Sequence, residues 1–161
     1  MFFRGYVRTK DKKCAEKFKN RTDFKTYDQV KDLDEFAGIL SVDTILIDID
    51  DYDQSEIMMQ MVEDNDIRCR VYETTRGKHF LFKNSDVDKC FTHTKLACGL
   101  TADIKVGVKN SYEVLKLNGQ ERPVIYDILE GEEYQTVPLW MLPVKTSADF
   151  IDMGAGDGRN Q

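Results

Sequence analysis

The sequence predicts an α+β domain built on a mixed or antiparallel sheet. Strand-like segments outnumber helical ones, the helical segments fall early and in the middle of the chain, and an Asn118-Gly119 pair marks a tight hairpin turn. The chain of 161 residues is long enough for one domain with its own core. Its hydrophobic fraction of 41% and charged fraction of 32% fit a soluble globular protein.

The first part of the chain predicts two strands separated by a helix. Residues 1–9 (MFFRGYVRT) form the first strand, which lysines follow at a turn. The short β-branched segment 42–50 (VDTILIDID) predicts a second, central strand. A helix is predicted between them, over 27–40, because apolar residues recur there at helical spacing: Val30, Leu33, Phe36, Ala37 and Leu40.

The middle of the chain predicts two helices and a hairpin. Segments 68–75 and 78–84 predict strands that an Arg-Gly turn joins. Segment 88–99 (DKCFTHTKLACG) predicts a short helix closed by its last glycine. A helix is also predicted over 54–65, where four apolar residues fall on one side: Ile57, Met58, Met61 and Val62.

The last part of the chain predicts three strands and a terminal anchor. Segments 102–107, 112–117 and 122–129 predict strands, and the last two flank the Asn-Gly turn as a hairpin. Segment 137–143 (VPLWMLP) predicts a short helix that anchors the end of the domain.

The net charge of −6 is unevenly distributed along the chain. Residues 1–31 carry ten Lys or Arg and four acidic residues, a net charge of +6, so the remainder carries −12. A basic N-terminal face beside an acidic remainder of the chain can attract phosphates locally. The alternative is that this face is an ordinary solvated surface.

The composition predicts a cytoplasmic protein without a membrane segment. No apolar stretch approaches the roughly 18 residues of a membrane span, and residues 1–13 lack the features of a secretory signal. Cys14, Cys69, Cys90 and Cys98 form no CxxC motif, so reduced thiols are expected.

An apolar strand ends in a cluster of aspartates in the segment ILIDIDDYDQ (45–54). Like charges repel unless a positive partner compensates them. Because side chains alternate along a strand, Asp48 and Asp50 project from one face. Two carboxylates at that spacing can hold a pair of divalent ions, and hard oxygen ligands favour Mg²⁺ or Mn²⁺. Asp51 and Asp53 fit a helix cap or a surface role better.

The segment ETTRGKHFLFKN (73–84) places Arg76, Lys78 and His79 at a glycine-containing turn. Three cationic or donor groups within four residues suit a polyphosphate. The alternative is an ordinary hairpin whose histidine packs against Leu81.

The segment ADIKVG (102–107) places Asp103 in a short apolar strand. Near Asp48 and Asp50, this residue completes a three-carboxylate metal site. Lys105 lies two residues on and on the same face, where it can meet a phosphate or a template backbone.

The order of DID, a glycine-containing turn with KHFLF, and ADIK resembles the three motifs of the archaeo-eukaryotic primase superfamily. It is most similar to the primase–polymerase domain of phage and plasmid replication primase-helicases, over roughly residues 40–145. The resemblance implies an RRM-like catalytic sheet joined to an N-terminal α/β unit. It also implies template-dependent synthesis of primers, or extension of DNA, from nucleoside triphosphates with two Mg²⁺ or Mn²⁺ ions.

The resemblance also implies roles for individual residues. Asp48, Asp50 and Asp103 are the implied metal ligands and catalytic residues. His79 is the implied contact to the incoming triphosphate and is also predicted to be catalytic, with Arg76 and Lys78 as further nucleotide-binding residues. Lys105 is added to the predicted nucleotide-binding residues because it shares the strand face of Asp103. The TRGKH segment carries Lys before His where many relatives carry a small residue, so this contact differs in detail.

The resemblance divides the chain into a catalytic domain (1–145) and a linker (146–161). The segment FIDMGAGDGRNQ is similar to the linker of phage primase-helicases, so a helicase domain is expected in the full-length chain. The other implied partners are a single-stranded DNA template and nucleoside triphosphates, and no membrane partner is expected.

Two other function classes stay open on the sequence. A non-catalytic RRM-like nucleic-acid-binding module needs exposed aromatics but no carboxylates. A metal-dependent nuclease can use the same acids. Zinc is not expected, because Cys90, His93 and Cys98 lack a fourth ligand at the usual spacing.

Overall fold

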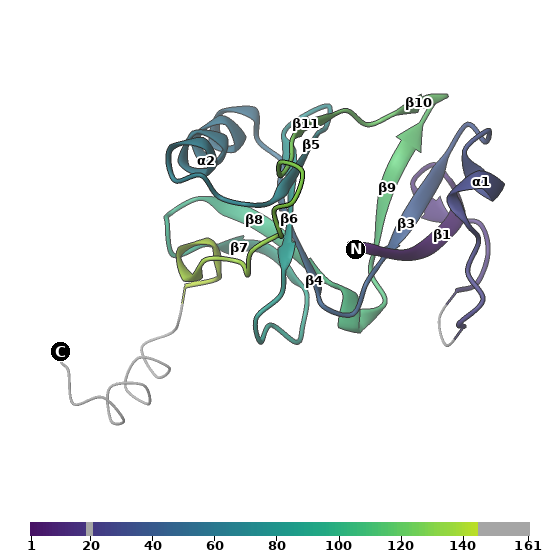
Figure 1. The fold of residues 1–161 in the computed structure, drawn as a ribbon, viewed down its shortest axis with the longest axis horizontal. Coiled ribbons are helices and arrows are strands. Elements are labelled where there is room, and N and C mark those ends of the chain that lie inside the picture. The colour runs from purple at the N-terminus through teal and green to yellow at the C-terminus, as the bar shows by residue number, and fades with distance from the viewer. Residues whose placement is uncertain (19–20, 145–161) are drawn as a thin grey trace, which may run out of the picture.

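The computed structural model describes residues 1–18 and 21–144. It is an α+β fold with two antiparallel sheets and few helices (Figure 1). One sheet has six strands in the order β11-β5-β6-β4-β8-β7, and the other has five in the order β10-β9-β3-β1-β2. The predicted α+β class with an antiparallel sheet is therefore confirmed.

The elements have the following bounds. The six-stranded sheet contains β4 (Thr44–Ile49), β5 (Arg70–Glu73), β6 (Lys78–Lys83), β7 (Phe91–Lys95), β8 (Thr101–Val106) and β11 (Val124–Tyr126). The five-stranded sheet contains β1 (Phe3–Lys10), β2 (Lys13–Cys14), β3 (Phe36–Leu40), β9 (Tyr112–Leu117) and β10 (Gln120–Glu121). The helical segments are α1 (Tyr27–Val30), α2 (Tyr52–Asp64), η1 (Gly107–Lys109) and η2 (Leu139–Met141).

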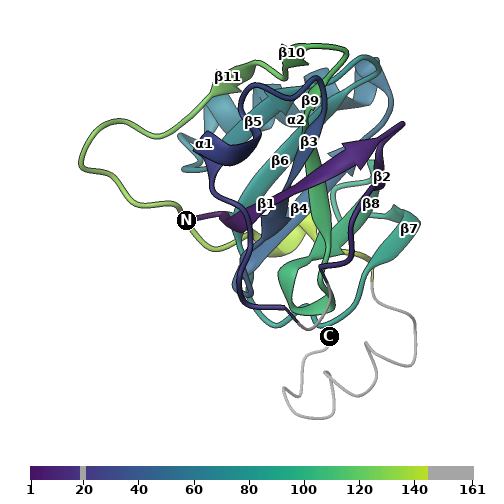
Figure 2. The same ribbon diagram turned by 90° about the vertical axis from the view of Figure 1, so that its right-hand side faces the viewer.

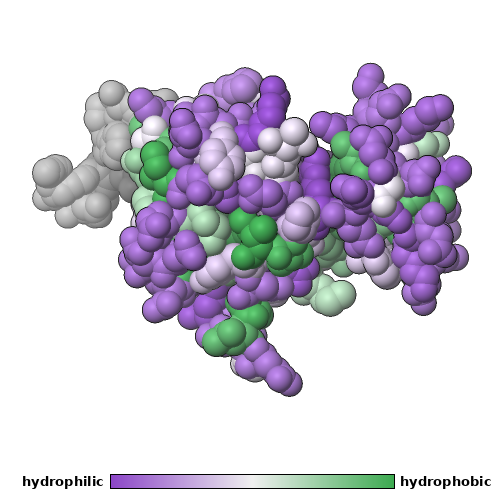
Figure 3. Space-filling model, turned by 90° about the horizontal axis from the view of Figure 1, so that it is seen from above, coloured by the Kyte–Doolittle hydropathy of each residue, from purple (hydrophilic) through white to green (hydrophobic). Residues whose placement is uncertain are grey.

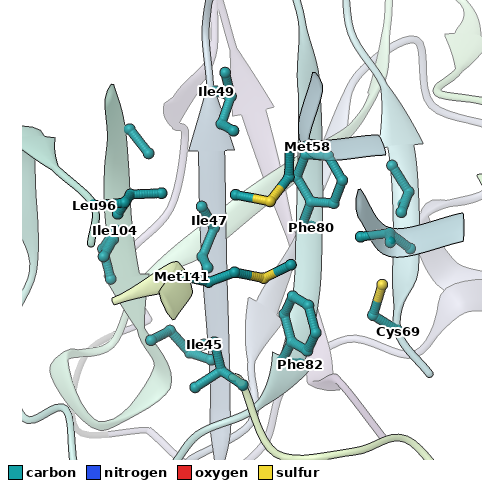
Figure 4. Packing of buried hydrophobic residues seen from close by; sticks show 14 of the residues in the cluster. Ile45, Ile47, Ile49, Met58, Cys69, Phe80, Phe82, Leu96, Ile104 and Met141 are labelled. Atoms are coloured by element: carbon teal, nitrogen blue, oxygen red, sulfur yellow. The ribbon is translucent and has the colours of Figure 1, made fainter. Parts of the chain in front are cut away.

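The main hydrophobic core lies between the six-stranded sheet and α2. Alternation along β4 sends Ile45, Ile47 and Ile49 to this face, where all three are fully buried (Figure 4). They pack beside Phe80 and Phe82 of β6, under methionines from α2 and η2. Leu46 and Asp48 alternate with these residues along β4 and therefore lie on its opposite face.

A second hydrophobic cluster joins the two sheets. It includes Phe36, Leu40 and Leu115 from the five-stranded sheet and Leu46 and Leu81 from the six-stranded sheet. The two sheets therefore pack against each other through this cluster. Figure 1 shows them side by side and converging toward the bottom of the view, and Figure 2 shows the five-stranded sheet in front. From above, the surface is mostly hydrophilic, and a notch separates its larger part from its smaller part (Figure 3).

Most predicted strands are confirmed. β1, β4, β5, β6, β8 and β9 lie within or close to the predicted ranges, and β4 is central in its sheet. The turn between β9 and β10 has positive φ at Asn118 (52°) and Gly119 (78°), as the two-residue hairpin signal predicts. The hairpin partner is β10, however, because β11 crosses to pair with β5 in the other sheet.

The predicted helix over 27–40 is wrong beyond its first turn. Only Tyr27–Val30 is helical, and Phe36–Leu40 forms β3, which is buried along its whole length. β3 pairs with β1 on one side and β9 on the other. A short apolar run fits either a buried helix or a buried strand, and here two neighbouring strands decide the outcome.

Two further predictions are corrected by the structure. Segment 88–99 is not a helix, because residues 91–95 form strand β7 paired with β8 and Gly99 (φ 96°) lies in the turn between them. The α2 helix is confirmed, but its buried side consists of Ser55, Met58, Met59 and Val62, and Ile57 is exposed.

The predicted linker 146–161 lies outside the described residues. Within the described residues, no helix has both the length and the apolar character needed to cross a bilayer.

Candidate functional site

Three of the predicted site residues form a row across neighbouring strands. Asp48 on β4 lies directly opposite His79 on β6 and directly opposite Asp103 on β8. Directly opposed residues of antiparallel strands share one face, with their Cβ atoms about 4.5–5.5 Å apart. Leu46 and Leu81 lie on this same face and pack against the five-stranded sheet, so the row faces that sheet. Segments far apart in the chain therefore meet at Asp48.

His79 is the buried centre of a charged network between the two sheets. Its Nε2 lies 3.1 Å from Asp48 Oδ1, and its Nδ1 pairs with a carboxylate oxygen of Glu113 on β9. The second oxygen of Glu113 accepts a hydrogen bond of 3.4 Å from Arg122 Nη1. Acidic and basic groups thus alternate from Asp48 to Arg122, and each buried charge has a partner.

The network raises the pKa of His79 and lowers the pKa of Asp48. Burial alone lowers the pKa of His79, but the carboxylates of Glu113 and Asp48 outweigh it and raise that pKa to about 9. Burial alone raises the pKa of Asp48, but its hydrogen bond to His79 and the charge of His79 hold it below its ordinary value. At neutral pH the pair is therefore an imidazolium beside a carboxylate.

The raised pKa of His79 predicts a loss of stability at alkaline pH. Below about pH 6.5 the imidazole is protonated in both the folded and the unfolded chain. Between that pH and about 9 only the folded chain keeps the proton, so the free energy of unfolding falls by up to about 3 kcal/mol. Denaturant unfolding at several pH values measures this fall. His93→Gln, a change at the other histidine of the chain, keeps the fall, whereas the same fall in His79→Gln contradicts the assignment.

Asp50 has a counter-ion, Arg76, that lies 26 residues away in the chain. Arg76, in the turn between β5 and β6, donates from Nε to Asp50 Oδ1 at 3.1 Å and from Nη2 to the other oxygen. Gly77 allows this approach, because a Cβ at that position lies only 1.8 Å from the Ile49 carbonyl oxygen. Arg76 and His79 therefore supply positive partners for Asp50 and Asp48, for which the sequence analysis expected divalent metal ions.

Lys78 lies on the other face of the sheet from His79. Its side chain is almost fully buried, donates to Ser55 Oγ at 3.2 Å, and pairs with Glu56 and Glu73. Its Nζ also lies 4.8 Å from the ring centroid of Tyr52. The structure therefore does not bring Lys78 to the row of Asp48, and its contacts tie the β5–β6 turn to α2.

Replacing Lys78 with Met is therefore expected to affect stability and not nucleotide affinity. The change removes one buried hydrogen bond and the ion pairs to two partly exposed glutamates, so the free energy of unfolding falls by about 1–3 kcal/mol. Lys83→Met, at an exposed position of the same strand, is the matched control. A loss of nucleotide affinity in folded Lys78→Met contradicts this structural role.

Two adjoining cavities open beside the row. The first has a volume of about 220 Å³ and is lined from both sheets, with Asp48, Asp50, Arg76 and His79 on one side and Glu113 and Arg122 on the other. The second, of about 450 Å³, is lined by Asp103 and by aromatic and basic residues that include Phe91 and Lys109. Lys105 and Tyr112 line both cavities and mark where they meet.

The carboxylates fit a divalent ion in kind but are not gathered around one position. No group of three or more His, Cys, Asp or Glu side chains within residues 1–18 and 21–144 is arranged to hold a metal. Arg76 engages both oxygens of Asp50, His79 engages Asp48, and the backbone N–H of His93 donates to Asp103 Oδ1 at 2.7 Å. Asp48 and Asp103 are hard oxygen donors on opposed positions, which suits Mg²⁺ or Mn²⁺.

The sequence-based predictions missed several residues of this cleft. Glu113 is the most important of these, since it is almost fully buried and holds His79 and Arg122 together. The sequence could have indicated that Glu113 faces inward, because alternation in YEVLKL places this acid on the same side of the strand as Leu115. Lys12 and Arg122 carried no such signal, since only the packing of the two sheets brings them to the cavity.

No protein-family model matches the chain, and neither the curated proteins nor the solved structures contain a match to it.

Proposed function

We propose that the chain is a template-dependent nucleotidyltransferase that makes primers, extends DNA, or does both, from nucleoside triphosphates. The observation that carries the proposal is the row of His79, Asp48 and Asp103 across β6, β4 and β8. It supports a common site for the three motifs that resemble the archaeo-eukaryotic primase superfamily.

The same resemblance suggests how the two sheets correspond to the implied architecture. The six-stranded sheet carries all three motifs and is our candidate for the RRM-like catalytic sheet. The five-stranded sheet is our candidate for the N-terminal unit, although it is mainly β and is completed by β9 and β10 from later in the chain.

Asp48 and Asp103 are the residues that we assign to a divalent ion. Asp50 can join them once Arg76 leaves its carboxylate, and this exchange frees the Arg76 guanidinium for a phosphate. Bound Mg²⁺ or Mn²⁺ supplies a lower pKa for the attacking 3′-hydroxyl and charge compensation for the leaving pyrophosphate.

The cationic residues of the first cavity suit the triphosphate. Lys105 has no ion pair in the described part of the chain, so it can receive a phosphate directly, and the largely exposed Arg76 can do so once it has left Asp50. His79 can reach a phosphate only by giving up one of its two carboxylate partners. We therefore assign His79 first to holding Asp48 and second to the nucleotide.

Incubation with labelled nucleoside triphosphates, a primed DNA template and Mn²⁺ tests the proposal. Product bands longer than the primer are expected. Shortened DNA indicates a nuclease instead, and a mobility shift without any change in length indicates a binding module. Either of those two results contradicts the proposed function.

A further inference from the structure

The turn between β1 and β2 has an unusual residue at its second position. Asp11 and Lys12 form a two-residue hairpin loop between the paired Lys10 and Lys13, and both have positive φ, 52° and 69°. Turns with positive φ at both positions are dominated by Asn-Gly and Asp-Gly. Lys12 therefore occupies a position that glycine normally fills, and such backbone outliers concentrate at functional sites.

The backbone of this turn is held from two sides. The N–H groups of Asp11 and Lys12 donate to the two carboxylate oxygens of Glu35 at 3.1 and 2.7 Å. The Tyr112 hydroxyl donates to the Lys12 carbonyl oxygen at 3.1 Å. These three hydrogen bonds fix the turn to β9 and to the residue that precedes β3, and the Lys12 side chain lines the first cavity.

Most charges around the first cavity are taken up in ion pairs, but two of its lysines form none with any residue that the structure describes. Asp48 and Glu113 flank His79, Asp50 pairs with Arg76, and Glu113 also holds Arg122. The ammonium groups of Lys12 and Lys105 form no ion pair among the residues that the structure describes. Lys105 lies 6.0 Å from the ring centroid of Tyr112, whose hydroxyl holds Lys12, so Tyr112 stands between the two lysines.

We infer that Lys12 is a further phosphate-binding residue, which together with Lys105 holds the polyphosphate chain of a nucleotide between the two sheets. Two ammonium groups that line a polar cavity without an ion pair suit an anion of at least two charges. The hydroxyls of Thr74 and Thr75 line the same cavity and offer neutral donors. This inference rests on the proposed function for the nucleotide, but its binding chemistry is tested separately.

Lys12→Gly separates the binding role from a structural one. Glycine suits the positive φ, so the melting temperature of this variant is expected to hold or rise while the charge is lost. Calorimetric titration with inorganic tripolyphosphate and with ATP measures affinity. A charge-assisted contact contributes about 1.5–3 kcal/mol, so both ligands are expected to bind roughly ten- to hundredfold more weakly.

Lys10→Ala and Lys13→Ala are the matched controls, since both lysines are exposed in the same hairpin and do not line the cavity. They are expected to change affinity less than about threefold, as outer charges are screened. Lys12→Arg is expected to retain most of the affinity. An affinity of Lys12→Gly equal to that of the controls, or weaker binding of single-stranded DNA with unchanged tripolyphosphate binding, overturns the inference.

The outcomes also distinguish this inference from the proposed function. If tripolyphosphate binding depends on Lys12 but the protein does not extend primers, the phosphate site is supported and the proposed transferase function is contradicted. Primer extension whose nucleotide KM does not change in Lys12→Gly removes the role of Lys12 alone. A wild-type protein that binds neither tripolyphosphate nor ATP overturns both.

Discussion

Replacing Asp48 with Asn is expected to lower the rate of primer extension at least about a hundredfold. Asp48 is the middle residue of the row, directly opposite His79 on one neighbouring strand and Asp103 on the other. Loss of its charge removes several kcal/mol of transition-state stabilisation by a bound divalent ion, and about 1.4 kcal/mol corresponds to each factor of ten. Single-turnover extension under saturating template and nucleotide measures the effect.

The matched control for Asp48→Asn is Asp53→Asn, in the same acidic segment but on the exposed start of α2. The control is expected to extend primers at close to the wild-type rate. Wild-type extension by Asp48→Asn removes the assignment of this residue.

The stability of Asp48 variants is expected to fall. A cluster of acids without a counter-ion gains stability when one is removed. In the structure, Asp48 instead pairs with the buried His79. Asp48→Ala therefore leaves a buried imidazolium with one partner fewer, whereas Asn keeps an acceptor oxygen near Nε2.

Replacing Glu113 with Leu is expected to cause the largest loss of stability. Glu113 is almost fully buried and is the common partner of His79 and Arg122. Removing one partner of a buried ion pair costs about 3–5 kcal/mol, because the remaining charges are left uncompensated. Denaturant unfolding at pH 7 measures the loss.

The control for Glu113→Leu is Glu130→Leu, which removes an exposed carboxylate. This change is expected to shift the free energy of unfolding by less than about 0.5 kcal/mol. A second variant, Glu113→Leu with His79→Leu, removes both charges and is expected to recover part of the loss. A loss below about 1 kcal/mol in Glu113→Leu contradicts the role of the network.

The central strands of the sheet that carries the row could be predicted from the sequence because their signals are local, whereas its edge strand β7 was predicted as a helix. Alternation and β-branched residues mark β4 and β6, and the Arg76-Gly77 turn joins β5 to β6. β3 could not be predicted in this way, since Phe36, Ala37 and Leu40 also continue the helical spacing that begins at Val30 and Leu33. Its strand conformation comes from β1 and β9, which lie far from one another in the chain.

The candidate site was predictable only on one side. Asp48, His79 and Asp103 lie on strands whose local patterns reveal which way their side chains face. Arg122 and Lys12 reach the cavity from turns of the five-stranded sheet, and no local pattern encodes how one sheet packs on another. Alternation indicates which way Glu113 faces, but it does not indicate that this acid meets His79. Lys78 shows the converse, since proximity in sequence to Arg76 and His79 did not place it at the site.

A crystal of the protein soaked with Mn²⁺ and a non-hydrolysable nucleoside triphosphate tests the central claim most directly. The account predicts anomalous density for Mn²⁺ contacted by Asp48 and Asp103, with Asp50 turned from Arg76 toward the ion and the triphosphate beside Arg76 and Lys105. Mn²⁺ bound elsewhere, or a nucleotide bound outside the cavity between the two sheets, contradicts it.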